Sequence, residues 1–338
     1  MILVTGGTGL VGSHLLYQLA LENEQLVAIH RKTSNLDYVK KVFSYFCAKE
    51  KASLLFKKIQ WIEADINDIS ALDNAFENIE YVYHCAAIVS FDSKDYHLMR
   101  KVNIQGTANI VNLALSHKIK KLVHISSIAT IEKKEGSNQI DESNEWDNEK
   151  NNYGYAISKF GAEMEVWRAG QEGLNIAIVN PGVIFGSGFW QLGPNALLDK
   201  VYNGFKFYTK GVTGFVTATD VAKAMLLLMQ STITNERFIL VNENKPFKDL
   251  MQLFAENLAV KMPKIYAKPW LTEIVWRLDS IKSSITGKPA LISKHSSRVS
   301  HYKYYYSSEK IKNTLNFDFT PFDTEIATIC KNYLNDKK

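Results

Sequence analysis

Two side chains that could move a proton lie four residues apart in the segment 153–159. At this spacing Tyr155 and Lys159 would project from the same face of a helix. A phenol has a pKa of about 10, too high for efficient proton transfer at neutral pH, and a neighbouring ammonium group favours the phenolate. The pair is therefore a candidate general acid/base. Tyr153 is the weaker candidate, because Ile157 and not a lysine lies four residues after it.

Two serines follow an apolar segment further up the chain. Residues 122–126 are typical of a buried strand, and the segment ends at Ser126 and Ser127. The carboxyl ends of parallel strands form the ligand-binding edge of an open α/β sheet. Ser127 could donate a hydrogen bond to a substrate oxygen there and polarise it, whereas the alternative for either serine is a helix cap. A tyrosine and a lysine at this spacing also arise by chance, so the serine segment strengthens the catalytic interpretation.

Glycines repeat near the N-terminus, directly after a short apolar segment. Gly7, Gly9 and Gly12 fit the pattern GxGxxG, and Gly6, Gly9 and Gly12 fit GxxGxxG. Glycine permits a tight strand-to-helix turn and lets the backbone approach a pyrophosphate at the start of the helix. The favoured interpretation is a dinucleotide-binding loop, and a purely structural turn is the alternative.

The second apolar segment, residues 26–30, ends without the carboxylate that commonly holds the ribose of NAD. Arg31 and Lys32 follow it, with two hydroxyl residues after them. Cations suit a 2′-phosphate, so we predict NADP(H) as the favoured cofactor and NAD(H) as the alternative. The alternative without a ligand is that these residues form a solvated basic loop. Asp65 either meets the adenine edge or caps the helix that begins near Ile69.

The elements that must position these residues alternate between short apolar segments and longer helical patterns. Strand–helix–strand units of this kind predict an α/β fold, a Rossmann-type doubly wound parallel sheet with helices on both faces. The predicted strands are 2–5, 26–30, 59–63, 81–84, 122–126, 175–179 and 238–241. The predicted helices are 10–22, 36–50, 69–77, 95–116, 155–172, 194–203, 219–230, 247–258 and 271–285.

The alternation weakens after residue 183, which divides the chain into two parts. Residues 1–183 form the predicted dinucleotide-binding core, to which 213–242 return. Residues 184–212 and 243–338 form a smaller, mainly helical part that binds substrate. The aromatic segment 301–306 predicts a strand in sheet packing or, alternatively, a pocket wall. The helix 271–285 is expected to pack normally rather than to cover a pocket or rest on a membrane.

Composition excludes several classes of function. The net charge of +5 (40 basic minus 35 acidic side chains) comes without a long basic block, so no nucleic-acid partner is expected. Three widely separated cysteines form neither a disulfide framework nor a metal cluster and fit a reducing compartment. No segment predicts a leader or a membrane span. We therefore expect a soluble, cytoplasmic protein.

Together these segments resemble the extended short-chain dehydrogenase/reductase superfamily, also called the NAD-dependent epimerase/dehydratase family. The resemblance covers roughly the first 190 residues in the family's order. The matching pieces are 5–12, 64–66, 84–87, 103–109, 126–127, Tyr155 with Lys159, 180–182 and 219–222.

The resemblance implies that Tyr155 is the general acid/base, that Lys159 tunes it and binds the nicotinamide ribose, and that Ser127 binds the reacting oxygen. Asn103 would support the site. Asn180 departs from the arginine that many members carry before Pro-Gly, so no role of that arginine is transferred. The implied cofactor-binding residues, with those predicted from the motifs, are Gly6, Thr8, Gly9, Leu10, Val11, Gly12, Arg31, Lys32, Asp65, Ile66, Ala86, Ala87, Tyr155, Lys159, Pro181, Gly182 and Val183.

Within the family the chain looks most like the dihydroflavonol reductase and 3β-hydroxysteroid dehydrogenase branch. That branch interconverts a carbonyl and an alcohol, and a homodimer built from helices 95–116 and 155–172 is common in the family. An aromatic set favours an apolar or aromatic substrate: Phe185, Phe189, Trp190, Phe205, Phe207, Tyr208 and Phe215. The alternatives are a nucleotide-sugar epimerase or dehydratase using NAD, and an NADP-binding sensor without turnover.

Overall fold

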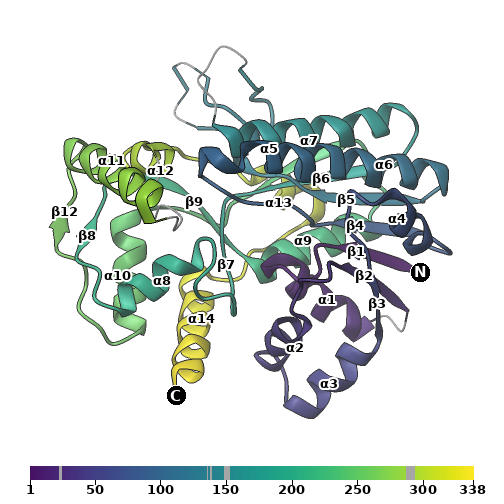
Figure 1. Ribbon diagram of the computed structural model, residues 1–338, viewed down its shortest axis with the longest axis horizontal. Coiled ribbons are helices and arrows are strands. Elements are labelled where there is room, and N and C mark those ends of the chain that lie inside the picture. Colours follow the sequence, from purple (N-terminus) through teal and green to yellow (C-terminus); the bar gives the residue numbers. More distant parts are fainter. Residues whose placement is uncertain (23–24, 135, 138, 148–152, 287–293) are drawn as a thin grey trace.

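The computed structural model describes residues 1–22, 25–134, 136–137, 139–147, 153–286 and 294–338. Within them seven strands pair in parallel, in the order β10-β6-β5-β4-β1-β2-β3 (Figure 1). The chain reverses its direction of strand addition between β1 and β4, which is the point where open α/β sheets bind ligands. The strands are β1 (Ile2–Thr5), β2 (Leu26–His30), β3 (Ile59–Glu63), β4 (Tyr81–His84), β5 (Lys121–Ile125), β6 (Ile176–Pro181) and β10 (Glu236–Leu240).

Helices cover both faces of this sheet, as the sequence predicted (Figure 1). One face packs against α1 (Leu10–Glu22), α2 (Leu36–Ser44), α3 (Lys49–Lys57) and α9 (Ala218–Gln230). The other packs against α4 (Ile69–Ala75), α6 (Gly106–Ser116) and α7 (Gly154–Gln171). Neighbouring strand residues serve opposite faces, because side chains alternate along a strand. Val4 joins the first core and Leu3 the second.

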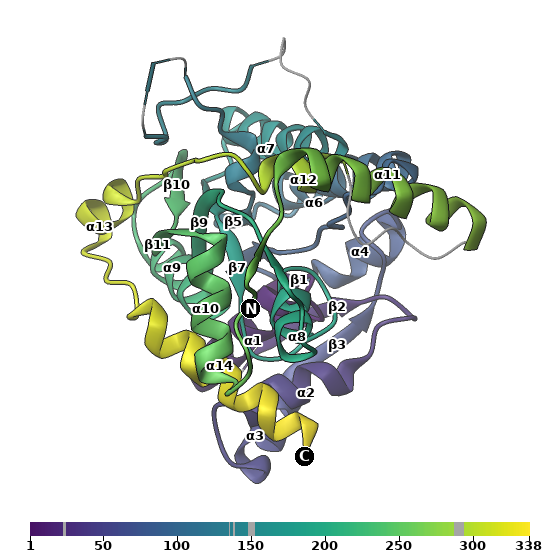
Figure 2. The same ribbon diagram turned by 90° about the vertical axis from the view of Figure 1, so that its left-hand side faces the viewer.

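A second layer of structure lies beside the carboxyl edge of the sheet. It contains the strands β7 (Val183–Phe185), β9 (Val212–Thr217) and β11 (Glu243–Pro246), and the pair β8 (Phe207–Tyr208) and β12 (Ile265–Tyr266). Its core contains Phe185, Phe215 and Tyr333. Figure 2 shows α10 and α14 side by side in this part. Its helices are α8 (Asn195–Tyr202), α10 (Phe247–Asn257), α11 (Pro269–Thr286), α12 (Lys294–Val299), α13 (Glu309–Leu315) and α14 (Phe322–Lys337).

The C-terminal helix also reaches back to the dinucleotide-binding part. Asp336 of α14 pairs with Lys41 of α2 at 2.7 Å and accepts hydrogen bonds from the Tyr45 hydroxyl and from Trp190 Nε1. Earlier in the chain, just before α13, Ser308 Oγ donates to the Val241 carbonyl and accepts from the Val241 N–H. The last third of the chain is thus attached to the core at separate points.

Two predicted helices differ from the structure. The predicted helix 36–50 is two helices, α2 and α3, because the chain turns at residues 45–48 and the second helix runs on to Lys57. The predicted helix 95–116 begins as α5 (Tyr96–Met99), widens into the π-helical segment η2 (Arg100–Gln105) and continues as α6. Residues 213–242 divide between the sheets, since β9 belongs to the small sheet whereas α9 and β10 pack in or against the large one.

The prediction of a strand at 301–306 was wrong. Val212 pairs with Lys303 and Ile140 pairs with Tyr306, each as a single bridge. The segment crosses from one partner to the other, so neither provides a continuous ladder. Tyr306 is buried, whereas Tyr302, which a strand would place on the same face, is 48% exposed, so the burial pattern does not alternate either.

The helix α11 also departs from the expectation of ordinary packing. Trp270, Ile274 and Leu278 follow one another at four-residue spacing and are 61%, 47% and 61% exposed. Among the described helices none has the length and apolar character needed to cross a membrane. The exposed apolar stripe is therefore a surface feature of the second part.

Candidate active site

The carboxyl ends of β1, β4, β5 and β6 lie next to one another at one edge of the central sheet. In the strand register Thr5 is opposite His84, His84 is opposite His124, and Ile125 is opposite Val179. The glycine loop, the serine pair and the Pro-Gly segment all start from this edge. Motifs that are far apart in the sequence are thereby brought together.

Tyr155 lies in the first turn of α7, where it is half-buried. Burial raises the pKa of its phenol, and a hydrogen bond with the Ser127 side chain opposes that rise. Ser127 also caps the short helix Ile128–Thr130, because its Oγ accepts from the Ala129 N–H at 3.1 Å. The predicted helix cap is therefore present at Ser127, whereas its predicted hydrogen bond to a substrate oxygen stays a prediction.

Lys159 lies one turn further along α7 and is 2% exposed. Its Nζ donates to the Ile125 carbonyl at 2.7 Å, which holds it at the end of β5. Burial lowers the pKa of this ammonium group to about 8, and the negative charge of Glu163 opposes the shift. The structure therefore places a cation of weakened basicity at the end of β5, one helical turn after Tyr155 on α7.

Two buried histidines lie beside Lys159, and the sequence analysis did not single them out. The rings of His84 and His124 stack with their centroids 5.0 Å apart. Burial and the charge of Lys159 lower the pKa of His84 to about 3 and that of His124 well below its usual value. Both rings are neutral at neutral pH, which leaves Lys159 as the charged member of the group.

Asn103 lies in the π-helical segment η2, a form of helix that is often found at functional sites. Its side-chain amide donates to the Ile88 carbonyl and to Ser158 Oγ, both at 2.9 Å, and its Oδ1 accepts from the Ile88 N–H at 2.7 Å. Asn103 thus attaches the loop that follows β4 to the catalytic helix α7. The supporting role that the sequence resemblance implied for Asn103 stays a prediction.

The glycine loop has the shape of an anion-binding turn. Gly6 has a φ of +68°, and a Cβ atom there would lie 2.5 Å from the Ala86 nitrogen. A Cβ atom on Gly12 would lie 2.2 Å from the Gly6 carbonyl oxygen. The N–H groups of the first turn of α1 have no helical acceptor, and no acidic side chain occupies that turn. The cradle fits the pyrophosphate of a dinucleotide. Thr8, Leu10 and Val11 lie within it.

Arg31 begins a tight turn at the end of β2. The Arg31 N–H donates to Ser34 Oγ at 3.2 Å, and the Ser34 N–H donates to the Arg31 carbonyl at 2.8 Å. Thr8 Oγ1 of the glycine loop lies 3.5 Å from Ser34 Oγ, so the basic turn is adjacent to the cradle. The side chains of Arg31 and Lys32 are exposed.

The remaining predicted cofactor residues line the same edge. Asp65 accepts from the N–H and the amide of Asn67, and Asp68 rather than Asp65 caps α4. The suggested helix cap at Asp65 was therefore wrong, whereas its position at the adenine edge stays a prediction. Ile66 is buried against Gly106. Ala86 follows β4, where its N–H donates to Thr5 Oγ1, and Ala87 after it is exposed.

The Pro-Gly segment passes close to the small sheet. A Cβ atom on Gly182 would lie 2.4 Å from the Gly214 carbonyl oxygen, so only glycine permits this approach. Pro181 ends β6 and Val183 begins β7, so the segment joins the two sheets. It lies on the same strand edge as Ser127, because β5 and β6 are neighbours.

The aromatic residues predicted to surround the substrate mostly form core instead. Phe185 and Phe215 are 1% and 0% exposed. Trp190, Phe205 and Tyr208 pack against the same core, and Phe189 faces Tyr38 with ring centroids 5.7 Å apart. Phe207 is the exception, at 39% exposed. This set gives no direct support for an aromatic substrate.

A different aromatic pair lies beside the phenol. Phe91, in the loop after β4, stacks on Tyr153 with ring centroids 5.9 Å apart and meets Tyr155 edge-on at 6.0 Å. The Phe91 side chain is nevertheless 48% exposed. Sequence reasoning missed Phe91, since no spacing relation connects it with Tyr155.

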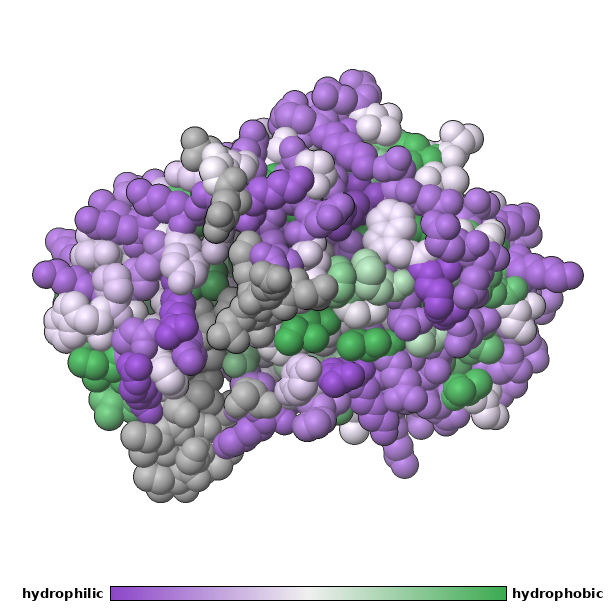
Figure 3. Space-filling view, turned by 90° about the horizontal axis from the view of Figure 1, so that it is seen from above, coloured by the Kyte–Doolittle hydropathy of each residue, from purple (hydrophilic) through white to green (hydrophobic). Residues whose placement is uncertain are grey.

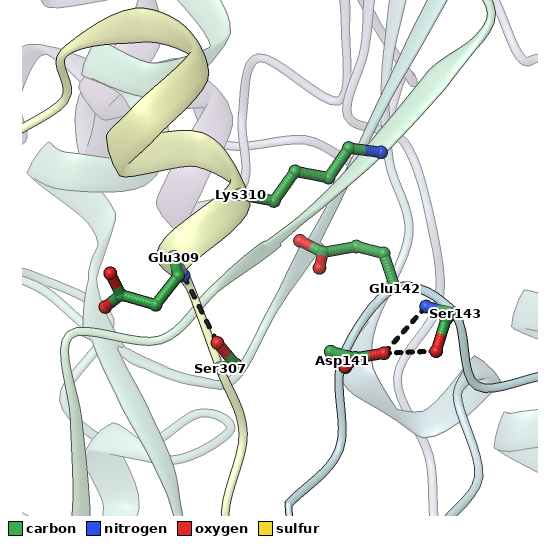
Figure 4. Close-up of a pocket in the computed structure, with 6 residues that line it drawn as sticks. All are labelled: Asp141, Glu142, Ser143, Ser307, Glu309 and Lys310. Carbon is green, nitrogen blue, oxygen red and sulfur yellow. Dashed lines mark hydrogen bonds between the residues drawn. The ribbon is translucent and has the colours of Figure 1, made fainter.

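A surface hollow lies apart from this constellation, beside the edge strand β10 (Figure 4). Its lining residues are already used in structural contacts. Glu142 accepts from the Ile239 N–H at 2.8 Å, and Lys310 Nζ donates to the Arg237 carbonyl at 2.9 Å. In the described residues no group of three or more His, Cys, Asp or Glu side chains could hold a metal ion.

The fold and this constellation define an enzyme of the extended short-chain dehydrogenase/reductase type. The model of the NAD dependent epimerase/dehydratase family matches residues 2–240, and the chain belongs to that family. This confirms the resemblance predicted from the motifs.

Named relatives and a solved structure agree with this assignment. The chain is 27% identical to the sterol demethylase protein B of Methylococcus capsulatus, over 80% of this chain and 78% of the relative. It is 27% identical to the anthocyanidin reductase of Arabidopsis thaliana, over 77% and 80% of the two chains. The UDP-glucose 4-epimerase of Thermus thermophilus in complex with NAD has the same fold, with a TM-score of 0.74, 18% identity and 98% of each chain covered.

Proposed function

We propose that this protein is an NADP(H)-dependent oxidoreductase that interconverts a carbonyl group and the matching alcohol on a small apolar or aromatic substrate. The observation that carries the proposal is the arrangement of three residues at one strand edge. The Ser127 side chain opposes the rise that burial causes in the pKa of the Tyr155 phenol, and Lys159 lies buried one helical turn away. A scaffold that only bound the cofactor would not need this set.

The cofactor would lie along the edge formed by β1, β4, β5 and β6. The glycine cradle would bind the pyrophosphate, and Arg31 with Lys32 would bind the 2′-phosphate. Lys159, Pro181 and Gly182 would border the nicotinamide end. When bound, the nicotinamide supplies or accepts a hydride at its C4 atom.

The chain's own residues would handle the proton. The raised pKa of Tyr155 keeps the phenol protonated at neutral pH, so in the direction of reduction it would donate to the carbonyl oxygen. Ser127 would hold the same oxygen by a hydrogen bond. The Lys159 charge would stabilise the phenolate that remains.

Phe91 and Tyr153 support an apolar or aromatic substrate. A half-exposed phenylalanine ring that touches the reacting phenol offers a flat apolar surface where the substrate must lie. The relative named anthocyanidin reductase favours the direction of reduction. A cytoplasmic location is part of the proposal, because Cys47, Cys85 and Cys330 are unpaired.

The second candidate is a nucleotide-sugar epimerase or dehydratase using NAD, which the likeness to the Thermus thermophilus epimerase favours. NADPH oxidation over a panel of aromatic, aliphatic and sugar-nucleotide carbonyl compounds separates the candidates. The proposal predicts turnover of added NADPH with an aromatic or apolar carbonyl compound. NAD retained through purification, with turnover of sugar nucleotides alone, would favour the epimerase. Tight NADPH binding with no turnover of any compound would indicate a sensor.

A further inference from the structure

A carboxylate lies buried in α7, two helical turns beyond Tyr155. Glu163 is 0% exposed, and Tyr155, Lys159 and Glu163 occupy positions i, i+4 and i+8 of the helix, which share one face. A carboxylate is stable in a protein interior only when donors or an opposite charge surround it. The groups around Glu163 therefore indicate what its charge is used for.

Donors from several elements converge on the two oxygens of Glu163. Oε2 accepts from side chains at the end of β5, in the turn after it and on β6, whereas Oε1 accepts from α7 itself and from β10. In the described residues these donors are Ser126 Oγ (2.5 Å), Thr130 Oγ1 (2.8 Å), Asn180 Nδ2 (2.9 Å), Trp167 Nε1 (3.3 Å) and Arg237 Nη1 (3.3 Å).

Two of these donors, Thr130 and Asn180, also hold the backbone of Ser127. The Ser127 carbonyl accepts from Thr130 Oγ1 at 2.8 Å and from Asn180 Nδ2 at 3.2 Å. Ser126, the neighbour of Ser127 in sequence, donates its hydroxyl to Glu163. Glu163 is thus connected to both sides of the Ser127 backbone, and the Ser127 side chain lowers the pKa of the Tyr155 phenol.

Glu163 also acts on Lys159 through its charge. The other titratable groups that face Lys159 are neutral near pH 7: burial keeps His84 and His124 deprotonated, and it raises the pKa of the Cys85 thiol to about 12. Tyr155 is neutral as well. Arg237, 15% exposed, pairs with Glu163 on the side of β10. The carboxylate is therefore the negative charge that opposes the loss of the Lys159 proton.

We propose that Glu163 is a positioning residue that, as a buried anion, fixes the Ser126–Ser127 segment against Tyr155 and keeps Lys159 charged. This inference rests on the proposed oxidoreductase function for its kinetic consequences. The effect of Glu163 on the charge of Lys159 can be measured without any enzymatic turnover. The inference also assigns a function to Asn180, which connects the carboxylate with the Ser127 carbonyl.

The first test replaces the charge and keeps the shape. Glu163→Gln should lower kcat by ~10–100-fold through misplacement of Ser127, while KM and the Kd for NADPH change by less than about threefold. Lys159 loses its proton as the pH rises through about 8, so the alkaline limb of the rate should move to lower pH in the variant. The matched control is Glu165→Gln on the same helix, where Glu165 pairs with Arg168 at 2.9 Å near the surface. It should leave both quantities unchanged.

The second test does not depend on a substrate. The pKa of Lys159, followed by NMR of ¹³C-labelled lysine in the protein without cofactor and assigned with Lys159→Met, should fall in Glu163→Gln and stay at its wild-type value in Glu165→Gln. An unchanged Lys159 pKa would overturn the proposal even if the proposed reaction is correct. A lowered pKa in a protein that turns over no carbonyl compound would uphold this part and refute the proposed function instead.

A third variant tests the proposal in the event that the Glu163→Gln protein does not fold. Ser126→Ala removes one donor to the carboxylate and should fold, because alanine fits the same space. It should lower kcat by a few-fold to about tenfold with unchanged NADPH binding, and it should lower the melting temperature because the buried carboxylate loses one donor. Wild-type kcat in Ser126→Ala, or in a folded Glu163→Gln protein, contradicts the positioning role.

Discussion

Tyr155 combines two opposing influences in a single side chain. Burial raises the pKa of its phenol, whereas the Ser127 side chain opposes that rise and so favours the phenolate that forms once the proton has left. A group in this environment retains its proton until a substrate oxygen develops negative charge. That behaviour suits a proton donor to a carbonyl compound.

Tyr155→Phe removes only the phenolic oxygen. We expect kcat to fall by ~10²–10⁴-fold, which is the usual contribution of a general acid, while the melting temperature and NADPH affinity stay close to the wild type. Steady-state kinetics, calorimetry and thermal unfolding of the purified variant measure the three quantities. Tyr153→Phe is the matched control and should retain most of the activity. A fully active Tyr155→Phe enzyme would refute the mechanism.

Arg31 should decide between the two cofactors. Its turn lies beside the glycine cradle, and its exposed side chain has no carboxylate partner in the described residues. A charge-assisted contact with a 2′-phosphate is worth ~1.5–3 kcal/mol, so Arg31→Ala should weaken NADP(H) binding by roughly 10–150-fold. Binding of NAD(H) should barely change, and high salt should reduce the difference.

Calorimetric titration of the wild type and Arg31→Ala with both cofactors checks each part. Arg100→Ala, at an arginine in the π-helical segment η2 away from the glycine loop, serves as the control. Equal affinity of the wild type for NAD(H) and NADP(H) would mean that the turn is only a solvated basic loop. The epimerase candidate would then gain support.

At the scale of elements, much could be predicted from the sequence, because each motif sits at a strand end. The six core strands before residue 183 were expected within one or two residues, and their parallel order follows from the crossover rule. The helix that carries Tyr155 and Lys159 was expected at 155–172 and observed at Gly154–Gln171. Regular periodicity and glycine spacing are local signals that a sequence displays directly.

The unpredicted parts depend on packing between distant segments. Nothing in the local pattern near Phe91 indicates that its ring would touch Tyr155, because a loop whose path is set by Asn103 determines the contact. Arg237 reaches Glu163 only because β10 joins the edge of the sheet beside β6. Glu163 itself carried a signal that could have been used, since it lies four residues after Lys159.

The glycine loop allows a contrast between two positions in one element. A Cβ atom on Gly12 would clash with the Gly6 carbonyl, whereas one on Gly9 would lie 3.4 Å from that same oxygen. We expect Gly12→Ala to lower the free energy of unfolding by ~1–3 kcal/mol and to abolish tight cofactor binding. Gly9→Ala should fold normally and lose cofactor affinity alone, because a methyl group there meets the pyrophosphate.

Thermal unfolding and NADPH titration of the two variants measure this contrast. A Gly12→Ala protein with wild-type stability would show that the loop can relax, which would contradict the close packing described for it. Wild-type NADPH affinity in Gly9→Ala would place the pyrophosphate elsewhere.

At the scale of the whole molecule, the surface bears on how copies of the chain associate. Several apolar residues on α6 and α7, Ile110 and Val166 among them, are buried within one chain. Leu98 and Met164 remain 49% and 38% exposed. Figure 3, which views the molecule from the side of α7, shows hydrophilic residues with small separate hydrophobic groups.

We therefore predict a homodimer through the face of α5 and α7, held by a small apolar centre with a polar rim. Light scattering across micromolar concentrations should give twice the mass of one chain. Met164→Arg should shift the equilibrium to the monomer, whereas Leu192→Arg, at an exposed leucine of the second part, should not. A monomeric mass for the wild type at every concentration would rule out the dimer.

The attachment of α14 to α2 has a consequence for how the molecule comes apart. Asp336 joins Lys41 and Tyr45 of the dinucleotide-binding part to Trp190 of the second part. Val241 and Ser308 form another connection further up. The two parts can separate only if the Asp336 contacts and the Val241–Ser308 hydrogen bonds both break. We therefore expect the slowly exchanging amides of both cores to lose their protection together, in a single opening event.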